Sequence, residues 1–207
     1  GGTGAEHFEA RWIFLRRPFR NPERHHAGAR NHCTLHLQKA RLSMPGVALM
    51  DIFLLLGEYF VGDAAFQVRT ILGSCVSITL WHPVARVGGM CHFLLPTRSN
   101  FGHNIHRLNG HYGDEALALM CQDLRALGVD ARQCQAKLFG GGNMFPGRVR
   151  SDSGHVGRRN GEAARELLLQ QGIPIVVESL FGMGHRQIIF DISNGDVWSR
   201  QVRPSAM

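Results

Sequence analysis

Cys75 and His92 have the residue types of a nucleophilic hydrolase. Cys75 ends the segment Thr70-Ile-Leu-Gly-Ser-Cys75, in which a Gly-Ser pair indicates a turn. His92 ends the apolar segment Val87-Gly-Gly-Met-Cys-His92. A thiol and an imidazole that meet in space are the minimum equipment for hydrolysing an amide or an ester through a covalent intermediate. This chemistry requires the fold to bring the two side chains together.

A β-hairpin would bring these segments together. Residues 76–81 alternate apolar and small polar side chains and are rich in β-branched types, which is typical of a strand. Residues 87–95 form a second apolar run, and the intervening residues 82–86 include a proline and favour a turn. The pattern therefore predicts two antiparallel neighbouring strands.

The loop length fixes the register of this hairpin. With residues 83–86 as the loop, the predicted pairs are His82 with Val87, Ser77 with His92 and Cys75 with Leu94. Directly paired residues share a face of the sheet, as do residues two apart on one strand. Cys75 and His92 would then be diagonal neighbours on one face, and Cys91 would point to the opposite face. A slip of one residue would reverse this result.

Several further motifs follow in a fixed order along the chain. They are Leu72-Gly-Ser-Cys-Val76, a Pro-containing turn, Gly88-Gly-Met-x-His-Phe-x-Leu-Pro96, Tyr112-Gly-Asp-Glu-Ala-Leu, Lys137-Leu-Phe-Gly-Gly-Gly, Gly157-Arg-Arg-Asn160, Gly172-Ile-Pro-Ile-Val176, Ile189-Phe-Asp and Asn194-Gly-Asp-Val-Trp198. Together they resemble the CheD family of chemoreceptor glutamine deamidases over about residues 51 to 203. The segment from Glu178 to Arg186 departs from the family pattern, in which an Asp and a Gly-Gly pair often stand.

The resemblance implies a role for each residue of the first motif. Cys75 would be the nucleophile, His92 the general base and acid, and Thr70 the residue that orients the imidazole. Backbone amides at Gly73 and Ser74 would bind the oxyanion. A paired imidazolium would lower the thiol pKa, and the reaction would pass through a thioester without a metal or an organic cofactor. The implied net result is conversion of a protein glutamine to glutamate with release of ammonia.

Periodicity in the rest of the chain predicts an α+β domain. Helices are expected at residues 114–127, where Gly128 follows, and from Asn160 as a cap to Gly172. Strands are expected at residues 53–61, 66–71, 76–81, 87–95, 136–139, 173–178, 187–192 and 197–202. Asn194-Gly195 predicts a hairpin between the last two strands. The family resemblance implies a CheD-like cysteine hydrolase fold of stacked β-sheets flanked by helices.

The remaining cysteines and histidines favour structural roles. Five cysteines without paired spacing argue against a disulfide framework and for a reducing compartment. His103, His106 and His111 lie in a Gly/Asn-rich segment without helical periodicity, which favours a solvated loop over a metal site. Such a loop beside Cys75 and His92 could contribute to substrate recognition.

Residues 1–49 differ from the rest of the chain. They hold eight of the 23 basic residues against three acidic residues, a net of +5 of the total +7. A disordered extension and an arm that binds nucleic acid or an acidic surface are both open interpretations. We favour a third, that the authentic protein starts at Met50 and that residues 50–207 form the deamidase domain. The body lacks an aromatic-rich basic motif, so nucleic-acid binding is not expected.

The implied substrate is the cytoplasmic domain of methyl-accepting chemotaxis receptors, reached from solution. Apolar runs such as residues 52–56 are far below the roughly 20 residues that span a membrane, so a cytoplasmic protein without membrane insertion is expected. Some family members also pair with a CheC-type phosphatase. Two alternatives stay open, namely a Cys hydrolase acting on other protein glutamines or on receptor methyl esters, and a non-catalytic receptor-binding adaptor.

Overall fold

The computed structural model describes residues 13–15, 49–98, 107–144 and 152–202. The elements in chain order are β1 (Ile13–Leu15), β2 (Met50–Phe53), β3 (Tyr59–Gly62), β4 (Phe66–Leu72), β5 (Val76–His82), β6 (Val87–Cys91), α1 (Gly113–Ala126), the 3-10 turn η1 (Ala131–Gln133), β7 (Gln135–Gly140), α2 (Asp152–Gln170), β8 (Ile175–Leu180), β9 (His185–Asp191) and β10 (Asp196–Val202).

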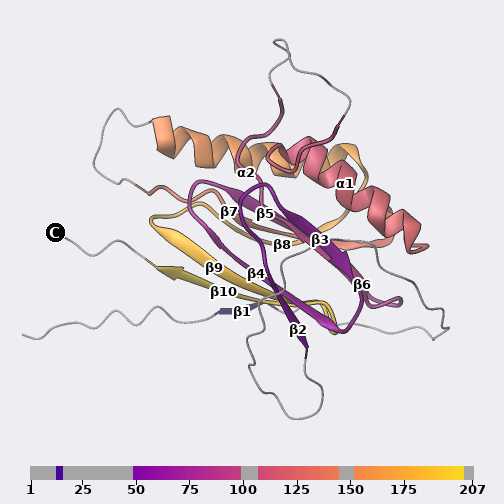
Figure 1. The fold of residues 1–207 in the computed structure, drawn as a ribbon. Helices are drawn as coiled ribbons and strands as arrows, with labels where there is room; N and C mark the ends of the chain where they lie inside the picture. The colour runs from indigo at the N-terminus through magenta and orange to yellow at the C-terminus, as the bar shows by residue number, and fades with distance from the viewer. Residues whose placement is uncertain (1–12, 16–48, 99–106, 145–151, 203–207) are drawn as a thin grey trace, which may run out of the picture.

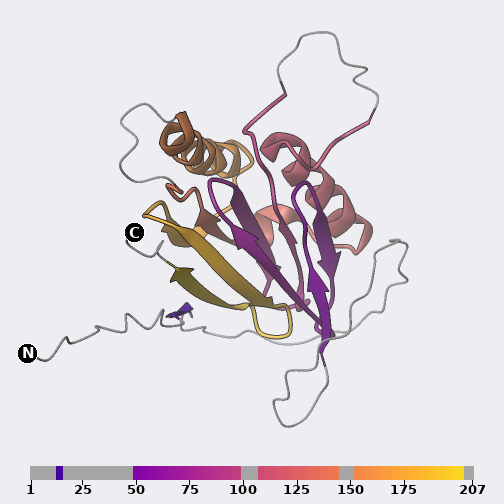
Figure 2. The ribbon, with the colours of Figure 1, turned by 60° about the vertical axis from the view of Figure 1, so that its left-hand side comes forward.

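The strands form two stacked sheets. Sheet A has the order β1-β10-β9-β4-β2, and sheet B has the order β3-β6-β5-β7-β8. The helices α1 and α2 pack on sheet B, on the side that faces away from sheet A (Figures 1 and 2). The three layers are therefore sheet A, sheet B and the helix pair. This arrangement confirms the predicted α+β class with stacked sheets.

Each pair of neighbouring layers encloses its own apolar core. The core between the sheets contains Leu54, Val68, Leu72, Met90, Phe139, Ile188 and Phe190. The core between sheet B and the helices contains Val76, Ile78, Leu80, Phe93, Met120, Leu124, Leu138 and Leu168. Sheet B is covered on both faces, which explains why β5 is buried at its first five positions. A residue of sheet B that points toward sheet A therefore lies in the first core.

The helix α1 begins and ends close to the predicted positions. Leu117, Met120 and Leu124 form its buried stripe, and Gly128 follows with a φ of 77°. Glycine adopts this left-handed conformation without a steric cost, so it stops the helix where the sequence indicates. The β9–β10 hairpin at Asn194-Gly195 is likewise confirmed, with Gly195 at a φ of 78°.

Two predicted elements depart most from the structure. Residues 53–61 are not one strand, because β2 belongs to sheet A and β3 to sheet B, with Gly57 at a φ of 82° between them. The second helix begins at Asp152, so Asn160 lies inside α2 instead of capping it. In both cases a continuous apolar or polar pattern concealed a change in the chain that only tertiary contacts reveal.

Of residues 1–49, the structure describes β1 and Leu49. The strand β1 pairs antiparallel with β10 at the edge of sheet A. The interpretation that the authentic protein starts at Met50 stays a prediction. Across the described ranges, neither helix is both long and apolar enough for a bilayer crossing.

Candidate active site

The β5–β6 hairpin has the predicted register. His82 pairs with Val87, and the isolated bridge between Val76 and Phe93 continues the same alignment beyond the end of β6. The amide of each bridge residue donates to the carbonyl of the other, at 3.1 and 3.0 Å. His92 directly precedes Phe93, and Cys75 directly precedes Val76. Both candidate residues are therefore neighbours in the chain of the last bridge of the hairpin. The residues at the open end of this hairpin are those singled out by the sequence.

The two adjacent residues Cys91 and His92 point to opposite faces of sheet B, as predicted. Cys91 is fully buried in the core under the helices, and its Sγ donates to the carbonyl of Ile78 at 3.9 Å. Burial raises the pKa of the Cys91 thiol to about 12, so this thiol is inert at neutral pH. Cys75 instead packs against the core between the sheets.

His92 reaches across to sheet A, where it meets Thr70 on β4. The Thr70 Oγ1 and His92 Nδ1 atoms are 2.9 Å apart, and both residues are buried. The same hydroxyl donates to the carbonyl of Leu54 at 2.8 Å. Because its only proton is used there, Oγ1 accepts a hydrogen bond from the N–H at Nδ1. His92 is therefore the Nδ1-protonated tautomer, and its Nε2 carries a free lone pair.

The free nitrogen of His92 has no hydrogen-bond partner among the described residues, although it is buried. A buried acceptor without a partner costs free energy, and such groups concentrate where a protein needs them for chemistry. A neutral imidazole with an open Nε2 is the state that can accept a proton from a thiol.

Burial governs the ionisation of both groups. It lowers the pKa of His92 to about 4, with a smaller lowering from nearby His111 and an opposing contribution from the backbone of Leu54. Burial also raises the pKa of the Cys75 thiol, against a smaller effect of its own backbone. Burial therefore disfavours the charged form of each group, which argues against the thiolate–imidazolium pair that the resemblance implies. Proton transfer would accompany attack on a substrate instead of preceding it.

The depressed pKa of His92 predicts a loss of stability in acid. The folded protein binds this proton only near pH 4, whereas the unfolded chain binds it near 6.5. The contribution of neutral His92 to the free energy of unfolding is complete above pH 6.5 and is lost as the pH falls toward about 4. Across that pH range, we expect the free energy of unfolding of wild type to fall by on the order of 2–3 kcal/mol more than that of His92→Gln. Urea unfolding of both proteins at each pH measures this, and parallel curves would contradict it.

The turn before β5 is held by the loop after β7. The amide of Gly142 donates to the carbonyl of Gly73 at 2.9 Å, and the amide of Gly141 donates to the carbonyl of Cys75 at 2.7 Å. Two carbonyls of the turn are thus fixed in direction, and the peptide groups between them are fixed with them. A rigid turn with oriented amides is the arrangement that an oxyanion site at Gly73 and Ser74 requires.

Gly140, the last residue of β7, lies directly against the backbone of Cys75. Its φ is 109°, and a Cβ on it would collide with the Cys75 carbonyl oxygen. Only glycine fits such a contact between two backbones. The amide of Phe181 and the guanidinium of Arg186 both donate to the Gly140 carbonyl, which fixes the loop from the other side.

Gly140→Ala should therefore be much more harmful than Gly128→Ala. Both positions have positive φ, which costs alanine roughly 1–2 kcal/mol. A Cβ at Gly128 meets nothing within 4 Å, whereas at Gly140 it collides with backbone. We expect the overpacking to add about 1–3 kcal/mol at Gly140 alone. Urea unfolding compares the two variants, and equal losses of stability would refute the close approach.

The segment from Glu178 to Arg186, where the sequence departs from the family pattern, buttresses this loop. Residues 181–184 carry the chain from β8 in sheet B to β9 in sheet A. Arg186 is buried and donates to the carbonyls of Gly140, Ser179 and Phe181 and to Gln201. No sequence pattern pointed to Arg186, because its partners are mostly backbone carbonyls brought together by the fold.

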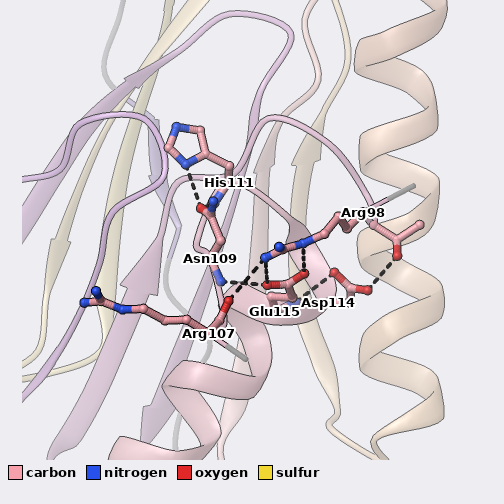
Figure 3. Close-up of polar contacts among 7 residues, drawn as sticks. Arg98, Arg107, Asn109, His111, Asp114 and Glu115 are labelled. Atoms are coloured by element: carbon pink, nitrogen blue, oxygen red, sulfur yellow. Dashed lines mark hydrogen bonds and ion pairs between the residues drawn. The ribbon is translucent and has the colours of Figure 1, made fainter. Parts of the chain in front are cut away.

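A polar network joins Arg98 to the residues that precede and begin α1 (Figure 3). Arg98 pairs with Glu115 at 2.7 Å, and Glu115 also accepts from the amide of Asn109 at 2.7 Å. Asn109 Oδ1 accepts from the ring of His111 at 2.8 Å. The network fixes the segment that leads into α1.

The segment before α1 contacts Gly57, which in turn binds the backbone of His92. The His111 ring lies where a Cβ on Gly57 would stand, and the amide of Gly57 donates to the His92 carbonyl at 2.7 Å. His103 and His106 lie outside the described residues. Across the described ranges, no three His, Cys, Asp or Glu side chains gather closely enough to hold a metal ion.

The fold and the site together define a class of protein: a two-sheet α+β domain with a cysteine turn and a Thr-bound histidine between its sheets. A family model described as CheD chemotactic sensory transduction matches residues 94–201. This range begins two residues after His92 and includes the Gly140 loop, α2 and Arg186.

Curated relatives extend the similarity. The chain is 63% identical over 155 residues to a protein of Albidiferax ferrireducens named "Probable chemoreceptor glutamine deamidase CheD 2", covering 75% of this chain and 89% of the relative. It is 43% identical over 150 residues to "Probable chemoreceptor glutamine deamidase CheD 1" of Chromobacterium violaceum, covering 72% and 77%. It is 39% identical over 148 residues to a CheD of Pyrococcus abyssi, covering 71% and 89%. This chain belongs to the CheD family.

Proposed function

We propose that this chain is a protein-glutamine deamidase that converts glutamine side chains of methyl-accepting chemotaxis receptors to glutamate, with release of ammonia. Membership of the CheD family and the names of its relatives support this activity. The observation that carries it is the buried His92, held by Thr70 with Nε2 free, on the face of sheet B toward which Cys75 packs.

In the first half of the reaction, the Cys75 thiol transfers its proton to His92 Nε2 as sulfur attacks the carboxamide carbon. The electron pair of the carbonyl moves to oxygen, and amides of the turn at Gly73 and Ser74 stabilise this oxyanion. The imidazolium returns the proton to the amide nitrogen, the carbon–nitrogen bond breaks, and ammonia leaves a thioester. Neutral resting groups suit this sequence, because proton transfer and attack are concerted.

In the second half, His92 takes a proton from water as its oxygen attacks the thioester. Collapse of the second tetrahedral intermediate breaks the carbon–sulfur bond, and the proton on His92 returns to the Cys75 sulfur. The products are glutamate and the free thiol. Thr70 accepts the hydrogen bond of the Nδ1–H group throughout, which keeps Nε2 directed at the reacting atoms and stabilises the transient imidazolium.

Thr70→Val should reduce kcat by about 10²-fold, because the imidazole loses the acceptor that fixes its tautomer and orientation. Thr70→Ser keeps the hydroxyl and should stay close to wild type. Nitrogen NMR of His92 provides an independent readout, since Nδ1 should lose its fixed proton only in the valine variant. Wild-type kcat in Thr70→Val would show that the contact is structural.

Two other functions compete with this proposal. A methyl-ester hydrolase would use the same residues but release methanol, and an adaptor would bind receptors without changing them. Partnership with a CheC-type phosphatase stays a prediction from the resemblance, and a cytoplasmic location stays a prediction from the short apolar runs and the cysteine content.

The deciding experiment incubates a purified receptor cytoplasmic fragment with the full chain and follows it by peptide mass spectrometry with assays for ammonia and methanol. Conversion of glutamine to glutamate with stoichiometric ammonia is expected. Methanol release from a methylated fragment without glutamine conversion would favour the esterase. Tight binding with no product would favour the adaptor.

A further inference from the structure

Asn160 connects the two chain segments that carry Cys75 and His92. It lies on α2, is fully buried, and its Nδ2 donates to the carbonyls of Ser74 at 3.1 Å and of Leu94 at 2.7 Å. The direction of the amide is fixed by these bonds, because a flip would place Oδ1 against two carbonyl oxygens. One side chain thus uses both of its N–H groups on two separate segments.

The two acceptors flank the candidate site. Ser74 precedes Cys75, and Leu94 is the second residue after His92. The last backbone contact between these segments is the bridge of Val76 with Phe93. Beyond this bridge the hairpin opens, and Asn160 holds its two ends at a fixed separation. The relative position of the Cys75 and His92 side chains depends on that separation.

The surface of α2 is shaped so that a short side chain can reach this far. A Cβ on Gly157 would lie 2.6 Å from the carbonyl oxygen of Gly141, and one on Gly161 would lie 2.7 Å from the ring of Phe181. These glycines therefore allow the helix to press directly on the loop that holds Cys75. Asn160 projects from the same face of the helix, between them.

The Oδ1 atom of Asn160 is buried without a hydrogen-bond partner in the described part of the chain. A residue kept only to anchor a helix would not need this unsatisfied acceptor, whose burial costs free energy. The amide therefore serves this place through its two N–H donors and not through its oxygen.

We propose that Asn160 is a positioning residue of the reaction: by tying Ser74 to Leu94 it sets the alignment of the Cys75 thiol with His92 Nε2. It does not touch the reacting atoms. The inference rests on the proposed function for its effect on turnover, but its effect on thiol reactivity stands independently of any substrate.

The test measures alkylation of Cys75 by iodoacetamide against pH, by peptide mass spectrometry, in wild type, His92→Gln, Asn160→Ala and the double variant. In a deamidation assay, misalignment of this kind should lower the kcat of Asn160→Ala by about 10²-fold and leave KM unchanged. His92→Gln should lower the alkylation rate, Asn160→Ala should lower it equally, and the double variant should show no further loss. Asn160→Ser, which keeps a single donor, should fall between wild type and alanine and replaces it if Asn160→Ala does not fold.

Leu168→Ala is the matched control, since Leu168 is a fully buried residue of the same helix that packs in the core away from this turn. It should lower the Tm but leave the pH profile of alkylation unchanged. The proposal is overturned if the Asn160 variants lower the Tm like Leu168→Ala yet keep the full dependence on His92. The proposed function and the role of Asn160 can fail separately. If wild type deamidates no receptor, the proposed function is refuted. If its Cys75 is still alkylated in a way that depends on both His92 and Asn160, the role of Asn160 is supported.

Discussion

Cys75→Ala should abolish conversion of receptor glutamine to glutamate, with a loss of about 10⁶-fold in kcat, as found when the nucleophile of another hydrolase is removed. The remaining residues can still bind the substrate, but no thioester can form. His92 could in principle activate water directly, yet the site would then lack the covalent step that divides the reaction into two easier ones. Mass spectrometry of the receptor fragment measures the effect.

Cys91→Ala provides the matched control for this prediction. Cys91 is adjacent to His92 in the chain, but its thiol lies in the other core and has a pKa of about 12. Its removal should leave kcat within a few-fold of wild type and reduce only stability. Activity in Cys75→Ala, or its loss in Cys91→Ala, would reverse the assignment of the faces of sheet B.

The geometry of the Cys75–His92 hairpin could be predicted because its determinants are local. The four-residue loop at positions 83–86 sets the register, and the two-residue period of a strand then assigns each side chain to a face. The pairing of His82 with Val87 is sufficient to predict that the side chains of His92 and Cys91 point to opposite faces of sheet B. Thr70 lies on another sheet, and the resemblance alone identified it as a neighbour of the imidazole.

The parts that the sequence could not predict all depend on tertiary contacts. Asn160 has the residue type of a helix cap, and nothing in the local pattern shows that α2 continues through it to reach two carbonyls elsewhere. The break between β2 and β3 is concealed because apolar residues stand on both sides of the short Gly57-Glu58 interruption. The effect of burial on the ionisation of His92 could not be predicted either, since it depends on the position of the ring between the two sheets.

His92→Gln should lower kcat by about 10²- to 10⁴-fold, the range that a positioned general base contributes. Glutamine can still donate to Thr70 but cannot take a proton from the thiol or return it to ammonia. The structure adds a sharper expectation for wild type. Because burial lowers the pKa of His92 to about 4, the free enzyme keeps its base neutral well below the ordinary value of 6.5.

The acid limb of kcat/KM should therefore lie near pH 4 and not near 6.5, with activity lost only as the pH falls through the lower value. A rate profile measured over the pH range in which the protein stays folded tests this directly. An acid limb at the ordinary histidine value would mean that the His92 ring is hydrated in the working enzyme, so that burial would no longer govern its ionisation.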